Sequence, residues 1–359
     1  MSLSPSDRRA GPAGRRSFGP ALWLLLLGFL LALAAVFLRF SMLQPPPPGE
    51  VSGDGVDVKS YGFVLEPSRI PLEEIVAAGV AKGAIPAIDF PALLRPAQVD
   101  SINRAERGKY LVPGDEVVGV AAGEKARAYP LRVLAWHEVV NDTLGGVPIA
   151  VTYSPLSGGV VVFHRRVGGE EVRFGVSGLL YNSNLLMYDV TAAAREQSLW
   201  SQLGRRAVVG PAVAAGRRLN VLPCALVPWG EWRADHPGTE VIDRDPSRIQ
   251  AYKSEPYGNY FGNDLLRFPV RPLPEGTDVP WKTRMIVTGR GEEWEAFSIP
   301  EIAARAGAAG EWRTRWRGVP IRFTVAGDPP MVRLFPEGLS DPPLVNFYCF
   351  YFAWYALGG

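Results

Sequence analysis

Chemically active side chains are concentrated between positions 137 and 142 of the chain. His137 and Asn141 are four positions apart, as are Glu138 and Asp142. We expect a helix of one to two turns here, on which each pair shares a face. A histidine beside carboxylates can shuttle protons or hold a metal, so His137, Glu138 and Asp142 are the candidate catalytic residues. The structural alternative is that Glu138, Asn141 and Asp142 cap and end this helix before the glycines at 145–146.

Two serines, Ser154 and Ser157, follow at the end of a predicted strand. They could act as nucleophiles if a base reached them, but neither lies in a Gly-x-Ser-x-Gly elbow or a Ser-x-x-Lys pair, so a simple turn is the alternative. A Gly/Ser/Asn loop at 174–183 could line a pocket or merely reverse the chain. The candidate ligand-binding residues are Asn141, Tyr153, Ser154, Ser157, Ser177, Tyr181 and Asn182. No two-histidine zinc signature occurs, and we predict neither a metal site nor a cofactor.

The composition limits the classes of protein that these residues can serve. The chain has 359 residues, of which 47% are hydrophobic and 21% charged, which is ordinary for a globular protein. A net charge of +2 gives no broad basic face for nucleic acid. Two cysteines exclude a disulfide scaffold and a cysteine-rich metal cage. Whether Cys224 and Cys349 pair is left open.

The amino terminus has the pattern of a membrane anchor. Residues 21–38 form an uncharged run rich in Leu and Ala, long enough to cross a bilayer core. Arginines precede the run, which predicts a cytoplasmic tail at 1–20, a single transmembrane signal anchor at 21–40 and an extracytoplasmic body. A proline-rich stalk at 41–60 follows. The alternative is a cleaved signal peptide. We predict one partner, the lipid bilayer, which residues 21–38 would span.

The body reads as mostly β, a β-rich α+β fold. Short runs of β-branched residues alternate with glycine turns, and one helix is expected at 71–84. Residues 123–131 align with 291–299, and residues 146–152 align with 318–324. We therefore predict two related β units, unless the similarity is chance: a first at 61–265 that holds the candidate site, and a second at 266–359. The second copy has mostly Ala, Gly and Arg where the first has its polar residues.

Several motifs of the body resemble one protein family. They lie at 84–89, 128–131, 136–142, 175–183, 199–202 and 351–354. In this order they are similar to an uncharacterised bacterial and archaeal family, domain of unknown function 3179, over roughly residues 60–359. Members of that family commonly carry Cys-Pro-Leu-Cys-Gly where this chain has Ser154 and Ser157. The resemblance thus implies that a thiol pair suited to a metal or to redox chemistry has been lost.

These observations favour a membrane-anchored extracytoplasmic protein that acts as a non-catalytic binding or accessory module and has lost a Cys-x-x-Cys site. The alternative is an extracytoplasmic metal-dependent or hydrolytic enzyme that uses His137, Glu138, Asp142 and the Ser154–Ser157 turn. Whether the protein is an enzyme, and which small molecule or protein it binds, the sequence leaves open.

Overall fold

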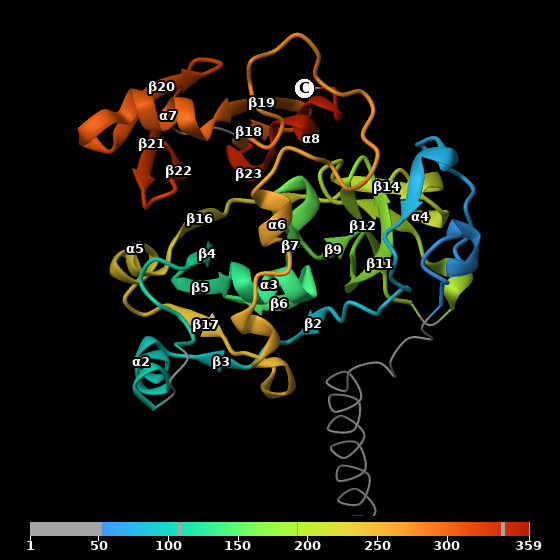
Figure 1. The fold of residues 1–359 in the computed structure, drawn as a ribbon, viewed down its shortest axis with the longest axis horizontal. Helices are drawn as coiled ribbons and strands as arrows, with labels where there is room; N and C mark the ends of the chain where they lie inside the picture. Colours follow the sequence, from blue (N-terminus) through green and yellow to red (C-terminus); the bar gives the residue numbers. More distant parts are fainter. Residues whose placement is uncertain (1–51, 106–108, 192, 339–341, 359) are drawn as a thin grey trace, which may run out of the picture. The chain divides into compact units, whose positions relative to one another are not determined.

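The computed structural model describes residues 52–338 and 342–358, apart from 106–108 and 192. Residues 50–359 form one compact unit, which is mostly β and contains several sheets (Figure 1). The β-rich prediction is therefore confirmed. None of the helices among the described residues has the length and apolar character needed to cross a bilayer. The predicted tail and anchor, and the stalk as far as residue 51, lie outside the described residues.

Two segments of this unit have the same order of elements. The first consists of β4 (Glu116–Ala122), β5 (Lys125–Pro130), α3 (Leu131–His137), β6 (Val139–Leu144) and β7 (Val147–Ser154). The second consists of β18 (Arg284–Arg290), β19 (Glu293–Ser298), α7 (Ile299–Ala306), β20 (Glu311–Trp316) and β21 (Val319–Ala326). We call them the first and second repeats.

Matching turns connect the strands of the two repeats. In each repeat a two-residue turn that begins with Gly joins the first two strands, and these glycines, Gly123 and Gly291, have φ values of 59° and 56°. Such tight hairpins require a left-handed backbone, which glycine adopts without strain. A fifth strand then follows each repeat and pairs with its last strand: β8 (Gly159–His164) follows the first repeat and β22 (Met331–Pro336) follows the second.

The repeats share their sheets with other strands. The eight-stranded sheet has the order β19-β18-β23-β8-β7-β6-β2, with β15 also on β8, and the others are β16-β4-β5-β17-β3, β20-β21-β22, β1-β11-β12-β13-β14 and β10-β9. The remaining strands are β1 (Ile75–Ala77), β2 (Ile88–Asp89), β3 (Leu93–Leu94), β9 (Arg166–Val167), β10 (Glu170–Glu171), β11 (Phe174–Tyr181), β12 (Asn184–Asp189), β13 (Leu199–Ser201), β14 (Arg206–Val209), β15 (Val221–Leu222), β16 (Ala225–Pro228), β17 (Glu240–Ile242) and β23 (Val345–Phe350). The remaining α-helices are α2 (Pro96–Ala105), α4 (Pro211–Ala214), α5 (Trp229–Asp235), α6 (Gly258–Phe261) and α8 (Tyr351–Tyr355).

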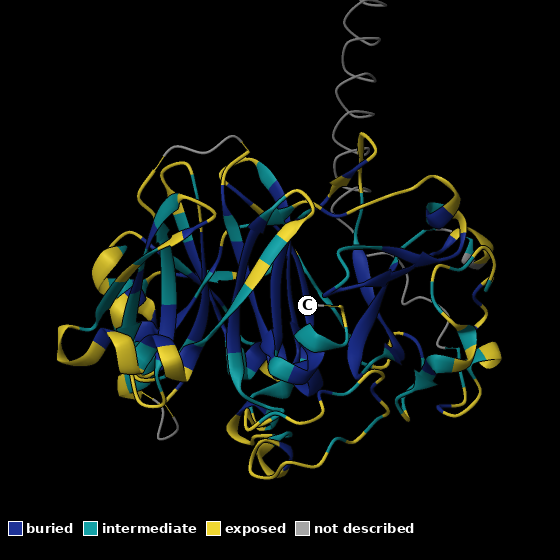
Figure 2. Cartoon of the chain, turned by 90° about the horizontal axis from the view of Figure 1, so that it is seen from above, coloured by how far each residue is buried: buried dark blue, intermediate teal, exposed yellow. Residues whose placement is uncertain are grey.

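Both repeats contribute to one hydrophobic core. Val117 and Leu134 of the first repeat belong to the same buried cluster as Ile286 and Ile302 of the second. Buried residues run along the central strands, and exposed residues gather in the loops and outer turns (Figure 2). The boundary predicted between residues 265 and 266 stays a prediction.

The helix expected at 71–84 is wrong. This segment contains a single turn of 3-10 helix, Leu72–Glu74, followed by β1. Its apolar residues have helical spacing, but β1 pairs with β11, whose residues lie about a hundred positions later in the chain. Tertiary pairing of this kind overrides a short local pattern.

Candidate functional site

His137 is the last residue of α3 and is almost completely buried. Its Nδ1 lies 2.7 Å from the carbonyl oxygen of Pro86, and its Nε2 lies 2.7 Å from the hydroxyl of Tyr252. Because a carbonyl only accepts, Nδ1 carries the proton and Nε2 accepts the Tyr252 hydroxyl. Burial lowers the pKa of the imidazole, which keeps it neutral. Both ring nitrogens are therefore engaged and neither is free to act as a base or metal ligand.

Glu138 ends α3 in a backbone conformation that is unusual for a residue with a side chain. Its φ is 56° and its ψ is −30°, and its N–H donates to the carbonyl of Leu134. In the second repeat, the residue that ends α7 is Gly307, with a φ of 52°. A positive φ costs a non-glycine residue about 1 kcal/mol or more. The first repeat thus places a glutamate where the second has a glycine.

The Glu138 carboxyl group is buried with little compensation. The residue exposes only 8% of its surface, and among the described residues its one polar side-chain contact is a weak one, 3.5 Å from Oε1 to the hydroxyl of Tyr257. Burial raises the pKa of this carboxyl to about 8. At neutral pH it is therefore mostly protonated, and it can donate a hydrogen bond as well as accept one.

Asn141 and Asp142 lie on strand β6, so the predicted helix over 137–142 is wrong beyond His137. The helix stops at Glu138, and Val139 and Val140 begin a strand that pairs with β7. Neighbouring residues of a strand point to opposite faces. His137 and Asn141, and likewise Glu138 and Asp142, therefore do not share the face of one helix. The alternative that these residues cap a helix holds for Glu138 only.

The two strand residues have separate structural roles. The amide group of Asn141 donates to Asp89 Oδ1 at 2.7 Å and to the Phe174 carbonyl at 2.8 Å, and it accepts the Phe174 N–H at 2.9 Å. Asp142 receives Arg127 Nη1 at 2.5 Å and the Tyr129 hydroxyl at 2.7 Å. Both side chains are buried and fully partnered. Both side chains therefore tie β6 to neighbouring segments of the fold.

Ser154 and Ser157 belong to a buried polar network between two sheets. The Ser154 hydroxyl accepts the N–H of Leu185 at 3.2 Å, and the Ser157 hydroxyl donates to the Ser154 carbonyl at 3.3 Å. Asn184 donates to Ser157 at 2.9 Å and to Gln202 at 2.8 Å, and Gln202 donates to Thr152 at 2.8 Å. Within the described residues, no hydrogen bond joins either serine to His137. The nucleophile-and-base pair that a hydrolase needs is thus not formed here.

Ser177, Tyr181 and Asn182 also serve the scaffold. Ser177 lies at an irregularity of β11, where its hydroxyl accepts the Leu179 N–H at 3.0 Å and donates to the Leu186 carbonyl at 2.5 Å. Asn182 binds the backbone of Arg271 through both its amide atoms, at 2.8 and 3.0 Å. Tyr181 is half-buried against a small apolar cluster.

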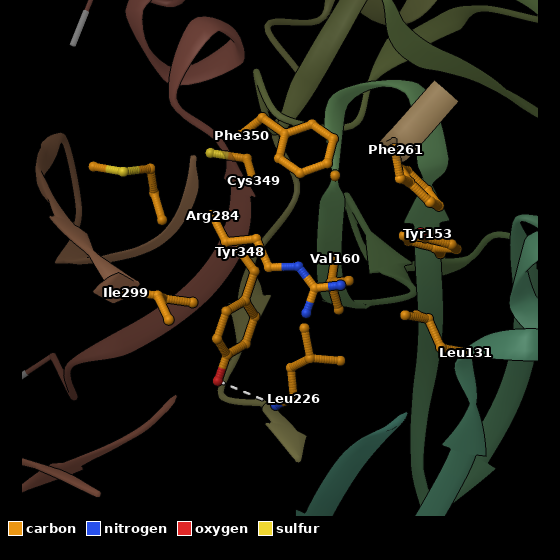
Figure 3. Close-up of a pocket in the computed structure, with 12 residues that line it drawn as sticks. Leu131, Tyr153, Val160, Leu226, Phe261, Arg284, Ile299, Tyr348, Cys349 and Phe350 are labelled. Carbon is orange, nitrogen blue, oxygen red and sulfur yellow. Dashed lines mark hydrogen bonds between the residues drawn. The ribbon is translucent and has the colours of Figure 1, made fainter. Parts of the chain in front are cut away.

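Tyr153 is the one predicted site residue that lines the pocket in Figure 3. The cavity is small, with a volume of about 20 Å³, which is close to the space that one water molecule needs. Leu131 and Ile299, which begin α3 and α7 at equivalent positions of the two repeats, both line it. Arg284 projects into the same space and pairs with Glu116 at 2.6 Å. The pocket therefore lies where the repeats meet.

Sequence reasoning missed the partners that complete this region. Tyr252 and Tyr257 come from a segment far along the chain, and Asn184 and Gln202 come from the β12 and β13 region. Glu116 and Arg284 occupy equivalent positions, 168 residues apart, and extending the repeat alignment to the first strands could have paired them. Among the described residues, no three His, Cys, Asp or Glu side chains lie close enough together to hold a metal ion. Cys224 and Cys349 are both buried and free.

Comparison with known proteins gives a family and no closer relative. No curated protein matches the chain. No solved structure matches it either. The family model described as "Protein of unknown function (DUF3179)" matches residues 82–324, more than half of the chain and the whole first repeat. The protein therefore belongs to the DUF3179 family, as its motifs indicate.

Proposed function

We propose that this protein is a single-pass, membrane-anchored extracytoplasmic protein whose body is a non-catalytic binding or accessory module. One observation carries the second half of the proposal. The groups that nucleophilic catalysis would use, His137, Ser154 and Ser157, each bind structural partners, and within the described residues no hydrogen bond joins His137 to either serine. Hydroxyls fixed in this way hold a scaffold in place, which suits a module that binds rather than transforms.

The serine turn supports the view that an ancestral thiol site has been lost. The family resemblance implies cysteines at the positions of Ser154 and Ser157. Serine is a poor ligand for soft metals and forms no disulfide. Here the two serines belong to a hydrogen-bond network with Asn184 and Gln202, and this network connects the two sheets without any cysteine.

The anchored topology rests on the hydropathy of residues 21–38 and on the arginines before them. Protease added to spheroplasts that produce the full chain should digest the body, whereas the same protease should leave a cytoplasmic control protein intact. A body that resists digestion until the membrane is permeabilised would contradict this topology. Recovery of the protein in the soluble fraction, shortened by its leader, would favour the cleaved-signal alternative.

An enzyme centred on Glu138 is the second candidate, and a specific observation favours it. Glu138 is strained, buried and weakly partnered, and its pKa is raised to about 8. A carboxyl group that exchanges its proton near neutral pH is suited to general acid–base catalysis. Neither His137 nor Asp142 is available to assist it, because their polar atoms are already bound.

One comparison separates the two candidates. Wild type and Glu138→Gln are assayed with a panel of chromogenic ester, amide and phosphate substrates, with metal content measured in parallel. Turnover by the wild type that disappears in the Gln variant would establish the enzyme and overturn the non-catalytic proposal. Equal, background-level rates for both proteins, with no stoichiometric metal, are the result that the binding module predicts.

A further inference from the structure

The outer edge of β6 in the first repeat is covered by another strand. Strand β2 lies parallel to β6 and pairs Ile88 with Val140 and Asp89 with Asn141. The N–H of Phe90 donates to the carbonyl of Asn141 at 2.8 Å. An extended stretch of only a few residues thus adds to this edge through its backbone.

The equivalent edge in the second repeat is open as far as the described residues show. Strand β20 is the terminal strand of the order β20-β21-β22, and no strand in the described part of the chain pairs with its outer side. Figure 1 shows β20 at the periphery of the structure. Arg313 is the equivalent of Asn141, because residues 146–152 align with residues 318–324 at an offset of 172 and the same offset relates Asn141 to Arg313. The position that receives a backbone hydrogen bond in the first repeat therefore lies on an unpaired edge in the second.

The register shows which backbone groups face outward. The N–H of Val325 donates to the carbonyl of Gly310, and Trp316 pairs with Val319 beside the two-residue turn. In an antiparallel pair, residues alternate between those that bond to the partner strand and those whose N–H and C=O point away. Because Gly310 bonds inward, the N–H and C=O groups of Glu311, Arg313 and Arg315 point to the open edge.

The side chains of this edge favour an acidic partner. Arg313 and Arg315 are both exposed. Arg313 already pairs with Glu311 at 2.7 Å and with Glu337 at 3.2 Å. The guanidinium of Arg315 binds the carbonyl of Gly318 and has no carboxylate partner among the residues that the structure describes. A second copy of β20 is a poorer occupant than an acidic segment. Antiparallel pairing centred on Thr314 or on Arg313 sets arginines of the two copies against each other, and pairing centred on Trp312 leaves Arg315 without a carboxylate opposite it. Like charges directly opposite each other destabilise a sheet.

We propose that the edge of β20, Glu311–Trp316, binds an extended acidic segment of a partner protein by strand addition, in the way that β2 covers β6. Backbone hydrogen bonds to Glu311, Arg313 and Arg315 provide the pairing, and the Arg315 side chain, which has no carboxylate partner among the described residues, selects acidic residues. This inference is independent of Glu138 and of the membrane anchor, and it identifies the kind of partner that an accessory module would recruit.

The test uses the full-length protein and a capped eight-residue peptide that alternates Glu and Val, with a Lys-Val peptide as its matched control. Fluorescence anisotropy should show binding of the acidic peptide at least about tenfold tighter than of the basic one, a difference of about 1.4 kcal/mol. Arg315→Pro removes one outward N–H without breaking a bond to β21, and it should abolish binding while leaving the melting temperature nearly unchanged. Arg315→Ala should weaken binding only in part.

The double variant Arg313→Glu with Arg315→Glu keeps the test informative if the proline variant does not fold. It should reverse the preference, so that the Lys-Val peptide binds more tightly. Failure of the wild type to bind either peptide, or binding that Arg315→Pro leaves unchanged, would overturn the proposal. So would self-association of the wild type that Arg315→Pro abolishes, because the occupant would then be a second copy.

Discussion

At the end of α3 the chain turns through Glu138, whereas at the end of α7 it turns through Gly307. The same contrast recurs along the two repeats. Buried Arg127 and Asn141 of the first repeat correspond to exposed Glu295 and Arg313 of the second. The two repeats thus share an order of elements but differ in which polar groups and strand edges they bury. The first repeat encloses polar groups and covers its edges with β2 and β17, and the second leaves β19 and β20 as terminal strands within the described chain.

The largest difference between the repeats should come from removing Arg127. Its guanidinium binds Asp142 at 2.5 Å and Glu240 at 2.7 Å, and the Arg127 and Asp142 side chains are only 7% exposed. Arg127→Ala leaves a buried carboxylate without its cation, and the free energy of unfolding should fall by about 3–5 kcal/mol. Glu295→Ala, at the exposed equivalent position, should change it by less than about 0.5 kcal/mol. Urea denaturation measures both, and equal losses would refute the contrast.

A smaller difference is expected at the strand edge. Asn141→Ala removes three buried hydrogen bonds that join β6 to Asp89 and Phe174, and it should lower the free energy of unfolding by about 2–3 kcal/mol. Arg313→Ala at the equivalent position should lower it by no more than about 1 kcal/mol, because its ion pairs are exposed. If Asn141→Ala proved as mild as Arg313→Ala, β2 would not be a firmly held part of the first repeat.

Substitution of Ser154, in the polar network between the two sheets, should give the smallest change in the free energy of unfolding. Ser154→Ala removes the acceptor of the Leu185 N–H and should cost about 1 kcal/mol in thermal or urea unfolding. The second repeat already has an alanine, Ala326, at this position. Ala326→Ser, on a half-buried site, should alter stability by less than about 0.5 kcal/mol. A cost of several kcal/mol for Ser154→Ala would mean that the turn has a larger role than the network indicates.

Sequence alone predicted the strands, the glycine hairpins and the repeated order, because these depend on local pattern. It failed for residues 138–142, where the outcome depends on distant partners. Asn141 binds Asp89 and Phe174, 52 and 33 positions away, and Glu138 contacts Tyr257, 119 positions away. Only the fold reveals that, among the three catalytic candidates, Glu138 has the weakest polar contacts to the described residues.

Glu138 is kept at a cost in stability, and the pH dependence of the free energy of unfolding tests this most directly. Between pH 4.5, the ordinary pKa, and about 8, the folded state holds a proton that the unfolded state has lost, so the free energy of unfolding should fall as pH rises. Glu138→Gln removes this titration. We predict that the variant becomes progressively more stable than the wild type from pH 5 to pH 8. A wild type at least as stable as the variant throughout this range would show that the carboxylate is structural and would contradict the account.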